Sequence, residues 1–554
     1  MPTTEYGVDQ FFSNSGTSPK MVWDVNGVLG WSPHNMCLQS QAFEQTTPWN
    51  PTTAVTFTAN AIAAPDGTMT ADKMVETAIA SNHQVLHANI TTIIGATYTF
   101  SAYLKAAERT WTALTKLNEA PSDWFDLANG VVGTSSQGGA ITSVGNGWYR
   151  CSITWIAASA THGPAIFNRQ SNGQVGTYTG DGVSGIYVWG AQLNRGFVAL
   201  PYLPTTTAAR YGLALDYDPV THAPLGLLCE PAATNLVLRS QEFNTTWFKS
   251  NITIGVDSTA APDGSVTADK IIDDTVNSNH SVYIGTTLTA AAYTFSVYLK
   301  AAERSWAALG LFTGALPYAY FNLTSGTIGT VSGGATAAIV SVGNGWYRCS
   351  ITMTATAATW YSLIFTAPSD NVYNYVGNGT GIYAWGAQLE LGTVATSPIP
   401  TFTASATRAA DQYNITPASI NYSSTAGSWW VEHYQIGGVG TNPRIILYNS
   451  AAFLYTTETT IYGLSDGTIL SKSGAPTATG NTQKVACAFQ SGDRALTAAG
   501  LVAATDAGST ALLLAPGASI IFGGTGGTVM RGYFRKLRYV PRRKTNAELV
   551  TETT

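Results

Sequence analysis

The chain has 554 residues, of which 45% are hydrophobic and only 11% are charged, with a formal net charge of −5. This composition excludes global disorder, because the chain can bury several cores. It disfavours nucleic acid as the main partner, because phosphate binding needs a basic surface. The length predicts roughly three or four domains, and the abundance of Thr, Tyr, Gly and Pro predicts many short strands joined by turns.

Targeting signals and cysteine chemistry narrow the class of protein further. The first residues lack the basic and apolar stretches of a signal peptide, and no apolar run approaches the roughly eighteen residues of a membrane-spanning helix. The five cysteines are too widely spaced for a disulfide framework or a CxxC metal site. We therefore expect reduced thiols in a protein that folds in a cytosol and is not inserted into a membrane.

The first two segments differ in pattern. Residues 1–30 are irregular and polar, and we predict a tether or virion-docking segment there. Residues 31–204 show the alternation of antiparallel strands; along residues 98–105, apolar and polar side chains follow one another strictly. One apolar and one polar face per strand is typical of a sandwich. We predict a jelly roll of roughly eight strands.

The same pattern returns in residues 233–402. Residues 143–154 and 341–352 have the identical sequence SVGNGWYRCSIT, and other motif pairs keep nearly the same spacing. Self-similarity over so long a period indicates a duplicated domain and not a solenoid repeat. We therefore expect two copies of one fold, termed copy 1 (31–204) and copy 2 (233–402). The cysteine of the repeated motif is expected to be a small core residue in each copy.

The remaining segments match neither copy. Residues 205–232 are rich in Pro and Asp, which predicts an ordered, mostly extended connector. Residues 410–550 contain new strands, such as Trp429–Tyr434, and end in a basic strand followed by a short helix. We predict a third β-sandwich there.

Several motifs resemble those of tailed-bacteriophage structural proteins. The sequences DYDPV at 216–220 and GLLCEPAATNL at 226–236 are similar to a signature of head-spike and tail-fibre modules, as are DVNGVLGWSPHN at 24–35 and the WGAQL strands. These modules are described as having a fold like carbohydrate-binding modules. YFRKLRYVPRR at 533–543 resembles a concanavalin-A-like (laminin-G-like) domain. The resemblance implies an all-β chain of two tandem jelly-roll β-sandwiches followed by a concanavalin-A-like β-sandwich.

The resemblance also implies a function, that of a virion surface fibre or spike protein that contacts host-surface carbohydrate during adsorption. Its expected partners are other phage virion proteins, further copies of itself in a trimer, and a host surface glycan. Its expected location is the particle surface, after assembly in the bacterial cytoplasm. The alternative is a purely structural capsid-decoration, tail or baseplate component without glycan binding.

The residues themselves do not indicate an enzyme. We find no clustered acidic pair of the kind that glycan hydrolysis needs, and neither a G-x-S-x-G elbow nor a phosphate loop. No cofactor is expected. Two acidic pairs at equivalent places, Asp66 with Asp72 and Asp263 with Asp269, could ligate a structural Ca²⁺, but turn chemistry explains the Asp-Gly sequences equally well. We therefore predict no metal site.

Aromatic positions that differ between the copies are the best candidates for a sugar site, because scaffold positions are kept in both. Trp124 and Tyr320 are equivalent, and each precedes a paired Phe. Strand alternation is expected to turn them outward, where a ring can stack on the apolar face of a sugar. Further candidates are neighbours of these two, a divergent loop and the start of the third domain: Asn118, Asp123, Tyr318, His162, Trp360 and Trp429. The alternative for each is loop packing or a contact between subunits.

Overall fold

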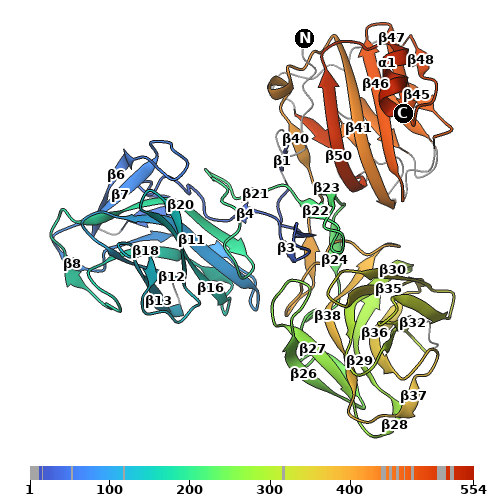
Figure 1. Cartoon of the computed structure of the whole chain (residues 1–554), viewed down its shortest axis with the longest axis horizontal. Helices are drawn as coiled ribbons and strands as arrows, with labels where there is room; N and C mark the ends of the chain where they lie inside the picture. Colours follow the sequence, from blue (N-terminus) through green and yellow to red (C-terminus); the bar gives the residue numbers. More distant parts are fainter. Residues whose placement is uncertain are drawn as a thin grey trace. The chain divides into compact units, whose positions relative to one another are not determined.

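The computed structural model describes residues 12–14, 16–51, 54–116, 119–314, 318–437, 444–447, 452–456, 461–466, 468–475, 480–507, 519–523 and 529–554. Within them the chain is almost entirely β-structure, in layered antiparallel sheets (Figure 1). The predicted all-β fold class of successive sandwiches is confirmed. The only α-helix of these residues is α1 (Asn546–Thr553), and no helix among them has the length and apolar character to cross a membrane.

The chain separates into two compact units. One runs from Trp31 to Gly212 and contains copy 1. The other combines the described part of residues 1–30 with residues 213–554. The second unit is therefore discontinuous in sequence, and copy 1 interrupts it.

Copy 1 is a sandwich of two six-stranded antiparallel sheets, ordered β15-β16-β11-β20-β7-β6 and β14-β13-β12-β18-β9-β5. The strands of the first sheet are β6 (Val55–Ile62), β7 (Ala71–Glu76), β11 (Thr97–Ala106), β15 (Ala140–Gly145), β16 (Trp148–Ile156) and β20 (Gly185–Arg195). Those of the second are β5 (Trp49–Pro51), β9 (Gln84–His87), β12 (Trp111–Lys116), β13 (Glu119–Asp126), β14 (Val131–Val132) and β18 (Pro164–Arg169). Short edge strands account for the excess over the roughly eight expected.

Copy 2 repeats this topology with sheets β34-β35-β30-β38-β27-β26 and β33-β32-β31-β36-β29-β25. The first contains β26 (Ile252–Thr259), β27 (Ala268–Asp273), β30 (Ala291–Ala301), β34 (Thr336–Ser341), β35 (Trp346–Ala355) and β38 (Gly381–Leu391). The second contains β25 (Phe248–Ser250), β29 (Ser281–Leu288), β31 (Trp306–Phe312), β32 (Tyr318–Asn322), β33 (Thr327–Val331) and β36 (Ala358–Ala367). Its inner core uses residues between 237 and 389 only, so that copy 2 encloses a core of its own.

The repeated twelve-residue motif forms a hairpin in both copies. Asn146 and Gly147 adopt positive φ angles of 52° and 76°, the turn conformation that this dipeptide favours. The strand that follows then alternates, with Cys151 opposite Ala102 of β11. Cys151 and its equivalent Cys349 are fully buried, and burial raises the pKa of both thiols well above its usual range. The prediction of core cysteines is confirmed.

Each copy begins and ends in paired short strands. In copy 1, β4 (His34–Asn35) pairs with β21 (Arg210–Tyr211), and in copy 2, β24 (Ala233–Asn235) pairs with β39 (Ala406–Arg408). Small ribbons complete the copies: β8 (Ala80–Ser81) with β19 (Tyr178–Thr179), β10 (Ile90–Thr91) with β17 (Thr161–His162), and β28 (Asn277–Asn279) with β37 (Asn374–Val376).

The last sandwich also has two layers. One sheet is ordered β22-β23-β50-β41-β46-β47-β48, and the other contains the run β1-β40-β49-β42-β43-β44-β45. The first is built from β22 (Leu215–Tyr217), β23 (Pro224–Cys229), β41 (Ala426–Gly437), β46 (Thr482–Gln490), β47 (Asp493–Ala498), β48 (Ala504–Asp506) and β50 (Arg531–Val540). The second is built from β1 (Ser13–Asn14), β40 (Tyr413–Ile415), β42 (Arg444–Leu447), β43 (Ala452–Thr456), β44 (Tyr462–Asp466), β45 (Ile469–Lys472) and β49 (Ile520–Phe522).

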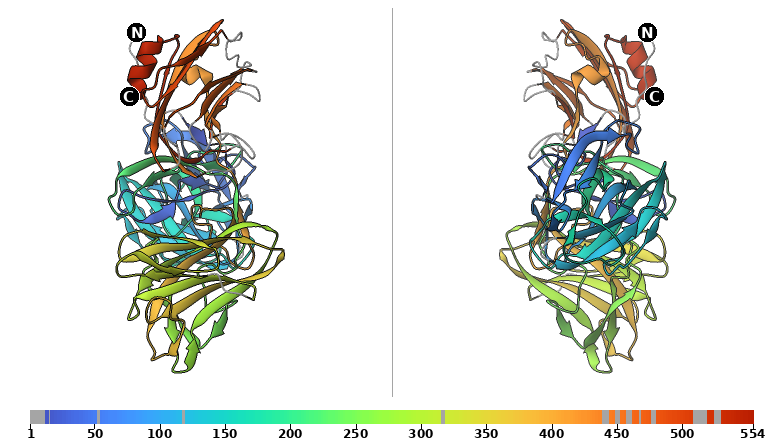
Figure 2. Two further views of the ribbon diagram at one scale, coloured as in Figure 1. Left: turned by 90° about the vertical axis from the view of Figure 1, so that its right-hand side faces the viewer. Right: turned by 90° about the vertical axis from the view of Figure 1, so that its left-hand side faces the viewer.

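The outer face of one layer of this sandwich is covered by helix α1 (Figure 2). Leu549 of α1 packs with Trp430 and three alanines of β46 and β47 in a cluster separate from the inner core. The indole Nε1 of Trp430 donates to the backbone oxygen of Glu552 at 2.7 Å. A capping box on Thr545 and Glu548 fixes where the helix begins.

Two distant segments complete the last sandwich. The hairpin β22–β23 lies within the predicted connector, and its strand β23 pairs with β50, with Leu227 opposite Phe534. Strand β1 pairs with β40, and the ring of Phe12 packs against Phe522 with centroids 4.9 Å apart. The predicted connector is ordered and extended here, but β22 and β23 are strands of the last sandwich and not a link outside it, and β1 of the predicted tether segment pairs into the same sandwich. β2 (Met21–Trp23) and β3 (Leu29–Trp31) form a further hairpin, and 3-10 helix η1 (Pro417–Ile420) follows β40.

Candidate functional site

One sheet face of copy 2 is lined by aromatic side chains. In the sheet β33-β32-β31-β36-β29-β25, strand alternation turns residues such as Ile284 and Ile364 into the core and turns their neighbours to the outer face. Trp306 is partly exposed on that face and is kept in copy 1 as Trp111; five further aromatic residues on it keep part of their surface exposed. They are termed the aromatic platform: Phe248, Tyr283, Phe312, Tyr318 and Tyr361.

Four rings of the platform form a row across four adjacent strands. Phe248 of β25 lies opposite Tyr283 of β29, with stacked rings 5.5 Å apart between centroids. The centroids of Tyr283 and Tyr361 of β36 are 5.8 Å apart, and those of Tyr361 and Phe312 of β31 are 6.3 Å apart. Phe248 is 59% exposed and the other rings are half-buried. The row therefore crosses four strands with one diagonal step, since Tyr283 lies opposite Leu363 and Tyr361 opposite Gly285, and the ring planes of Tyr283 and Tyr361 are inclined by 77°.

Two glycines inside strands let aromatic rings of this face pack closely against the backbone. A Cβ on Gly285 would meet the ring of Tyr361 at 3.0 Å, and a Cβ on Gly310 would meet the ring of Phe365 at 3.2 Å. Gly310 also lies opposite Tyr318, the fifth ring of the platform, on strand β32. Glycine in a strand interior often marks a close approach by another group, and here the approaching groups are the rings of Tyr361 and Phe365.

Hydroxyl and amide groups stand at the rim of the platform. The Tyr318 hydroxyl donates to Oδ1 of Asn371 at 3.2 Å, and the side chain of Asn371 is exposed. At the other end, the hydroxyls of Thr287 and Thr359 are 3.4 Å apart and exposed. The arrangement combines apolar rings with neutral hydrogen-bonding groups, which is the chemistry that a sugar presents on its C–H face and its hydroxyls.

Copy 1 lacks this platform although its sheet has the same strand order. By strand register, Tyr283 corresponds to Leu86, Phe248 to Asn50, Tyr318 to Ser122, Tyr361 to Gly163 and Gly310 to Thr115. The outer face of copy 1 instead buries a smaller cluster around Trp124 and Phe167. The aromatic platform is therefore a property of copy 2 and not of the shared scaffold.

The expectation that Trp124 and Tyr320 are exposed is wrong. Both lie on the outer face, opposite to the inward Phe125 and Phe321, as strand alternation predicts, but they are only 4% and 1% exposed. Neighbouring side chains on the same face cover them, and the Trp124 Nε1 donates to the backbone oxygen of Gln174. A large ring in the middle of a six-stranded sheet has neighbours on every side, so that facing outward is not the same as being accessible.

Three other candidates are buried as well. Trp360 is 5% exposed in the inner core of copy 2, and its equivalent His162 is fully buried, with Nδ1 2.9 Å from Oγ1 of Thr92. Trp429 packs in the core of the last sandwich, 4.6 Å from the Tyr539 ring between centroids. These rings belong to cores, where a sugar cannot reach them.

The remaining three predicted site residues, Asp123, Asn118 and Tyr318, differ in where they lie. Asp123 is fully buried, and its Oδ1 accepts the backbone N–H groups of Ser136 and Gln137, which is a turn-fixing role. Asn118 lies outside the described residues. Tyr318 is the one predicted residue that the structure places on the aromatic platform. The other residues of the aromatic platform could have been found by comparing the two copies strand by strand, because the difference between Tyr283 and its equivalent Leu86 is visible in the sequence.

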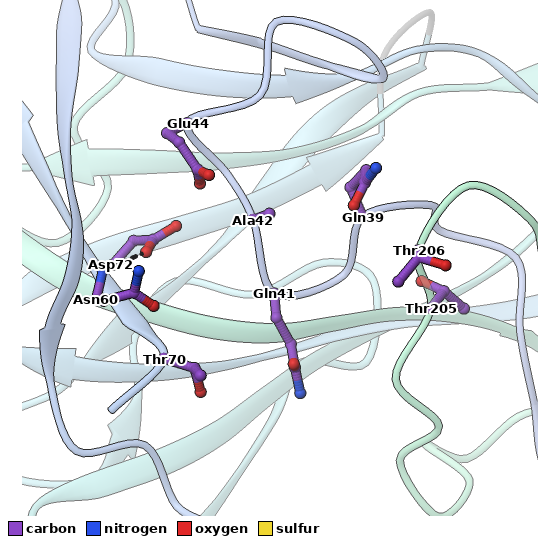
Figure 3. Close-up of a pocket in the computed structure, with 9 residues that line it drawn as sticks. All are labelled: Gln39, Gln41, Ala42, Glu44, Asn60, Thr70, Asp72, Thr205 and Thr206. Carbon is purple, nitrogen blue, oxygen red and sulfur yellow. Dashed lines mark hydrogen bonds between the residues drawn. The ribbon is translucent and has the colours of Figure 1, made fainter. Parts of the chain in front are cut away.

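Copy 1 contains a polar pocket of about 260 Å³ (Figure 3). It is lined by Gln39, Gln41, Ala42, Glu44, Asn60, Thr70, Asp72, Thr205 and Thr206. The two carboxyl groups, of Asp72 and Glu44, lie on the same side of it (Figure 3). Asp72 accepts the backbone N–H groups of Phe43 and Asn60, each at 3.0 Å. Burial is the largest effect on this carboxyl, and it raises the pKa of Asp72 to about 6.

The four acidic residues considered for Ca²⁺ all have hydrogen-bonding roles. Asp269 repeats the role of Asp72 in copy 2, accepting backbone N–H groups of two loops, and burial raises its pKa to about 6. Asp66 and Asp263 accept the backbone N–H and the side-chain hydroxyl two residues ahead in tight turns. Asp66 is not among the residues that line the pocket with Asp72. In the described parts of the chain, no group of three or more His, Cys, Asp or Glu side chains could hold a metal ion.

These observations define an all-β chain of sandwiches in which one of two duplicated copies carries an exposed aromatic sheet face. No family model and no curated protein matches the chain. Among solved structures it is similar to the N-terminal CBM22-1–CBM22-2 tandem domain of Paenibacillus barcinonensis Xyn10C, with a TM-score of 0.21 and 10% identity, covering 66% of this chain and 98% of that chain. It is also similar to the LG1–3 region of the laminin alpha2 chain, with a TM-score of 0.15 and 10% identity, covering 85% of this chain and 97% of that chain. Likenesses this weak carry no argument about binding.

Proposed function

We propose that this chain is a non-catalytic carbohydrate-binding protein of a phage particle surface, and that its working sugar-binding surface is the aromatic platform of copy 2. The observation that carries the proposal is the row of partly exposed rings from Phe248 to Phe312. Sugars present apolar C–H faces, and burying such a face against an aromatic ring is favourable through dispersion and removal of apolar surface from water.

The assignment to a phage virion is supported by the connector motifs at 216–220 and 226–236 and by the opening motif at 24–35. In this proposal other virion proteins hold the chain on the particle, and several chains, as a symmetric trimer, contact the host glycan together. Because the platform occurs in copy 2 alone, the multivalency that raises weak sugar affinities comes from several chains and not from the two copies of one chain.

Binding of the full chain to immobilised host-surface polysaccharides tests the proposal. The double variant Phe248→Asn/Tyr283→Leu carries the residues of copy 1 at both positions, so that the fold has a precedent and the stacked pair is removed. We expect this variant to lose binding while its unfolding midpoint stays close to that of the wild type.

The matched control is Phe197→Ala, which removes a 44% exposed aromatic ring from copy 1. This control variant is expected to bind like the wild type. If the wild-type chain binds no host polysaccharide at all, the alternative of a purely structural virion component is favoured instead.

A further inference from the structure

We infer that the aromatic platform takes an uncharged glycan, bound as a chain lying across strands β25, β29, β36 and β31; the inference rests on the proposed function. The first observation is the charge content of the sheet. Its six strands contain a single charged residue, Lys249. The Lys249 ammonium donates to the backbone oxygen of Asn244 at 2.7 Å, and the residue lies opposite Val282, a residue of the inner core.

The same sheet in copy 1 shows that the fold does not require this neutrality. Its strands carry five charged residues, Lys116, Glu119, Asp123, Asp126 and Arg169. By strand register, Asp123 and Lys116 correspond to Ala319 and Leu311 of the inner core of copy 2, whereas Asp126 and Arg169 share the outer face with Trp124 and Phe167. On the described strands of this sheet, the outer face therefore carries charged residues in copy 1 and none in copy 2.

The described residues beside the strands do not supply the positive charge that binding of an anionic sugar needs. The acidic residue next to this face, Asp370, accepts the backbone N–H and the hydroxyl of Thr330 at 2.7 and 3.0 Å. Recognition of carboxylate, sulfate or phosphate groups uses Arg or Lys side chains, and the strands of the platform offer neither on their outer face. The net charge of −5 adds a weak repulsion of polyanions.

The row crosses four strands, which indicates that the ligand is an oligosaccharide and not a single sugar. Neighbouring strands lie roughly 4.8 Å apart, so that a row over four strands spans about 14 Å. A monosaccharide covers part of that distance, whereas an extended oligosaccharide contacts all four rings.

The test measures binding of the full chain to a panel of glucans, mannans and galactans. Each polysaccharide is used as a pair with the same backbone, of which one member is neutral and the other is carboxymethylated or sulfated. We expect the neutral member of at least one pair to bind, with an affinity that is unchanged between low and high salt, and the charged member to bind at least about tenfold more weakly. Affinity is expected to rise with oligosaccharide length until the row is covered.

Two variants sharpen the result. Gly310→Thr introduces the residue of copy 1 beside the ring of Phe365; because that ring must shift, we expect neutral binding to weaken by about tenfold and the unfolding midpoint to fall slightly. Thr287→Lys adds a cation at an exposed position beside the row, two residues along β29 from Gly285, and is expected to improve binding of the charged member in low salt only.

The outcomes separate the inference from the proposed function. Tighter, salt-sensitive binding of the charged member that is lost in Phe248→Asn/Tyr283→Leu would overturn the uncharged-ligand inference and leave the proposed function standing. Failure of every polysaccharide to bind the wild type would overturn both. A change of oligomeric state in the platform variant, measured by sedimentation, with glycan binding intact would assign the platform to a second copy of the chain.

Discussion

At the scale of single residues, the contrast between Tyr320 and Tyr283 separates scaffold from surface. Both side chains lie on the outer face of one sheet, but Tyr320 is 1% exposed and is packed among Ala308, Leu363 and Phe365. Tyr283 is partly exposed and stands in the row between Phe248 and Tyr361. The ring that differs most conspicuously between the copies, at Trp124 and Tyr320, is therefore part of the scaffold, and the accessible rings are those around it.

Tyr320→Ala is expected to lower the free energy of unfolding by about 3 kcal/mol or more, because the truncation leaves a cavity among packed neighbours. Tyr283→Leu is expected to change it by less than about 1 kcal/mol, since a partly exposed residue is replaced by one of comparable apolar character. Chemical denaturation of the two full-length variants measures both values. An equal loss of unfolding free energy in the two variants would contradict the difference in burial between Tyr320 and Tyr283.

The carboxyl of Asp216 gives a pH-dependent prediction. Its Oδ1 accepts the backbone N–H of Trp23 at 2.7 Å, and its Oδ2 accepts the Tyr533 hydroxyl at 2.8 Å. Burial outweighs these hydrogen bonds and raises the pKa of Asp216 to about 6. Between the ordinary Asp pKa near 4 and a pH of about 6, the folded chain keeps a proton that the unfolded chain has lost. The contribution of Asp216 to the free energy of unfolding therefore falls as the pH rises from about 4 to about 6.

The variant Asp216→Asn cannot titrate; its amide oxygen can still accept from the Trp23 N–H, and its NH2 group can donate to the Tyr533 hydroxyl oxygen. We expect the difference in unfolding free energy between wild type and variant to shift in favour of the variant by roughly 2 kcal/mol from pH 4 to pH 7. Thermal or urea unfolding at a series of pH values checks this. Parallel pH profiles of the two proteins would show that Asp216 titrates normally.

At the scale of elements, the hairpin β22–β23 depends on one glycine. Gly226 has a φ of +118°, and a Cβ there would lie 2.4 Å from the backbone oxygen of Phe534 on β50. Gly226→Ala is expected to strain or break the pairing of β23 with β50 and to lower the unfolding midpoint by several degrees.

Gly30→Ala is the matched control, because a Cβ at that position meets nothing within 4 Å. Differential scanning calorimetry of the two variants checks the prediction. A midpoint for Gly226→Ala equal to that of the control would mean that the hairpin does not pair with β50.

The N-terminal segment is fixed to the last sandwich by a buried charge. Lys20 is 2% exposed, forms an ion pair with Asp411, and lies 3.3 Å from a carboxylate oxygen of Glu230, which also meets Arg408 at 3.3 Å. Lys20→Met leaves the two carboxylates with less compensating charge and is expected to destabilise the unit by about 3 kcal/mol or more. Urea denaturation of the full chain checks this; an unchanged midpoint would indicate that the segment is a free tether.

The elements also show how far sequence reasoning reaches. Strand alternation predicted the faces of β11 and β16, the Asn-Gly turn and the duplication, because these depend on residues close together in the chain. The pairing of β23 with β50 was missed, since strand partners some 300 residues apart leave no local pattern. The burial of Trp124 was missed because exposure depends on the neighbouring strands. The platform residues apart from Tyr318 were overlooked, although the charge-free strands around Tyr283 carried a readable signal.

At the scale of the whole molecule, the two copies are insertions into one discontinuous sandwich. Each copy enters and leaves through paired strands, β4 with β21 and β24 with β39. The sandwich that they interrupt is assembled from three separate stretches, namely residues 12–30, 213–231 and 409–554. The chain is therefore one base with two inserted domains, and not a row of three domains in series.

Removal of copy 1, residues 31–212, through a short Gly-Ser linker is expected to leave the rest of the chain folded, with near-native far-UV circular dichroism and cooperative unfolding. The fragment 409–554 alone lacks β1 and the hairpin β22–β23, so that it exposes the strand edges of β40 and β50 and is expected to aggregate or remain unfolded. A stable, monomeric 409–554 fragment would contradict the discontinuous base.

The central claim is that the aromatic platform of copy 2 is the glycan-binding surface. The most direct measurement is isothermal titration of one neutral oligosaccharide into three proteins: the wild type, the chain without residues 31–212, and Phe248→Asn/Tyr283→Leu. The account predicts equal affinity for the first two and no measurable heat of binding for the third. Full binding by the platform variant, or loss of binding on removal of copy 1, would place the sugar elsewhere.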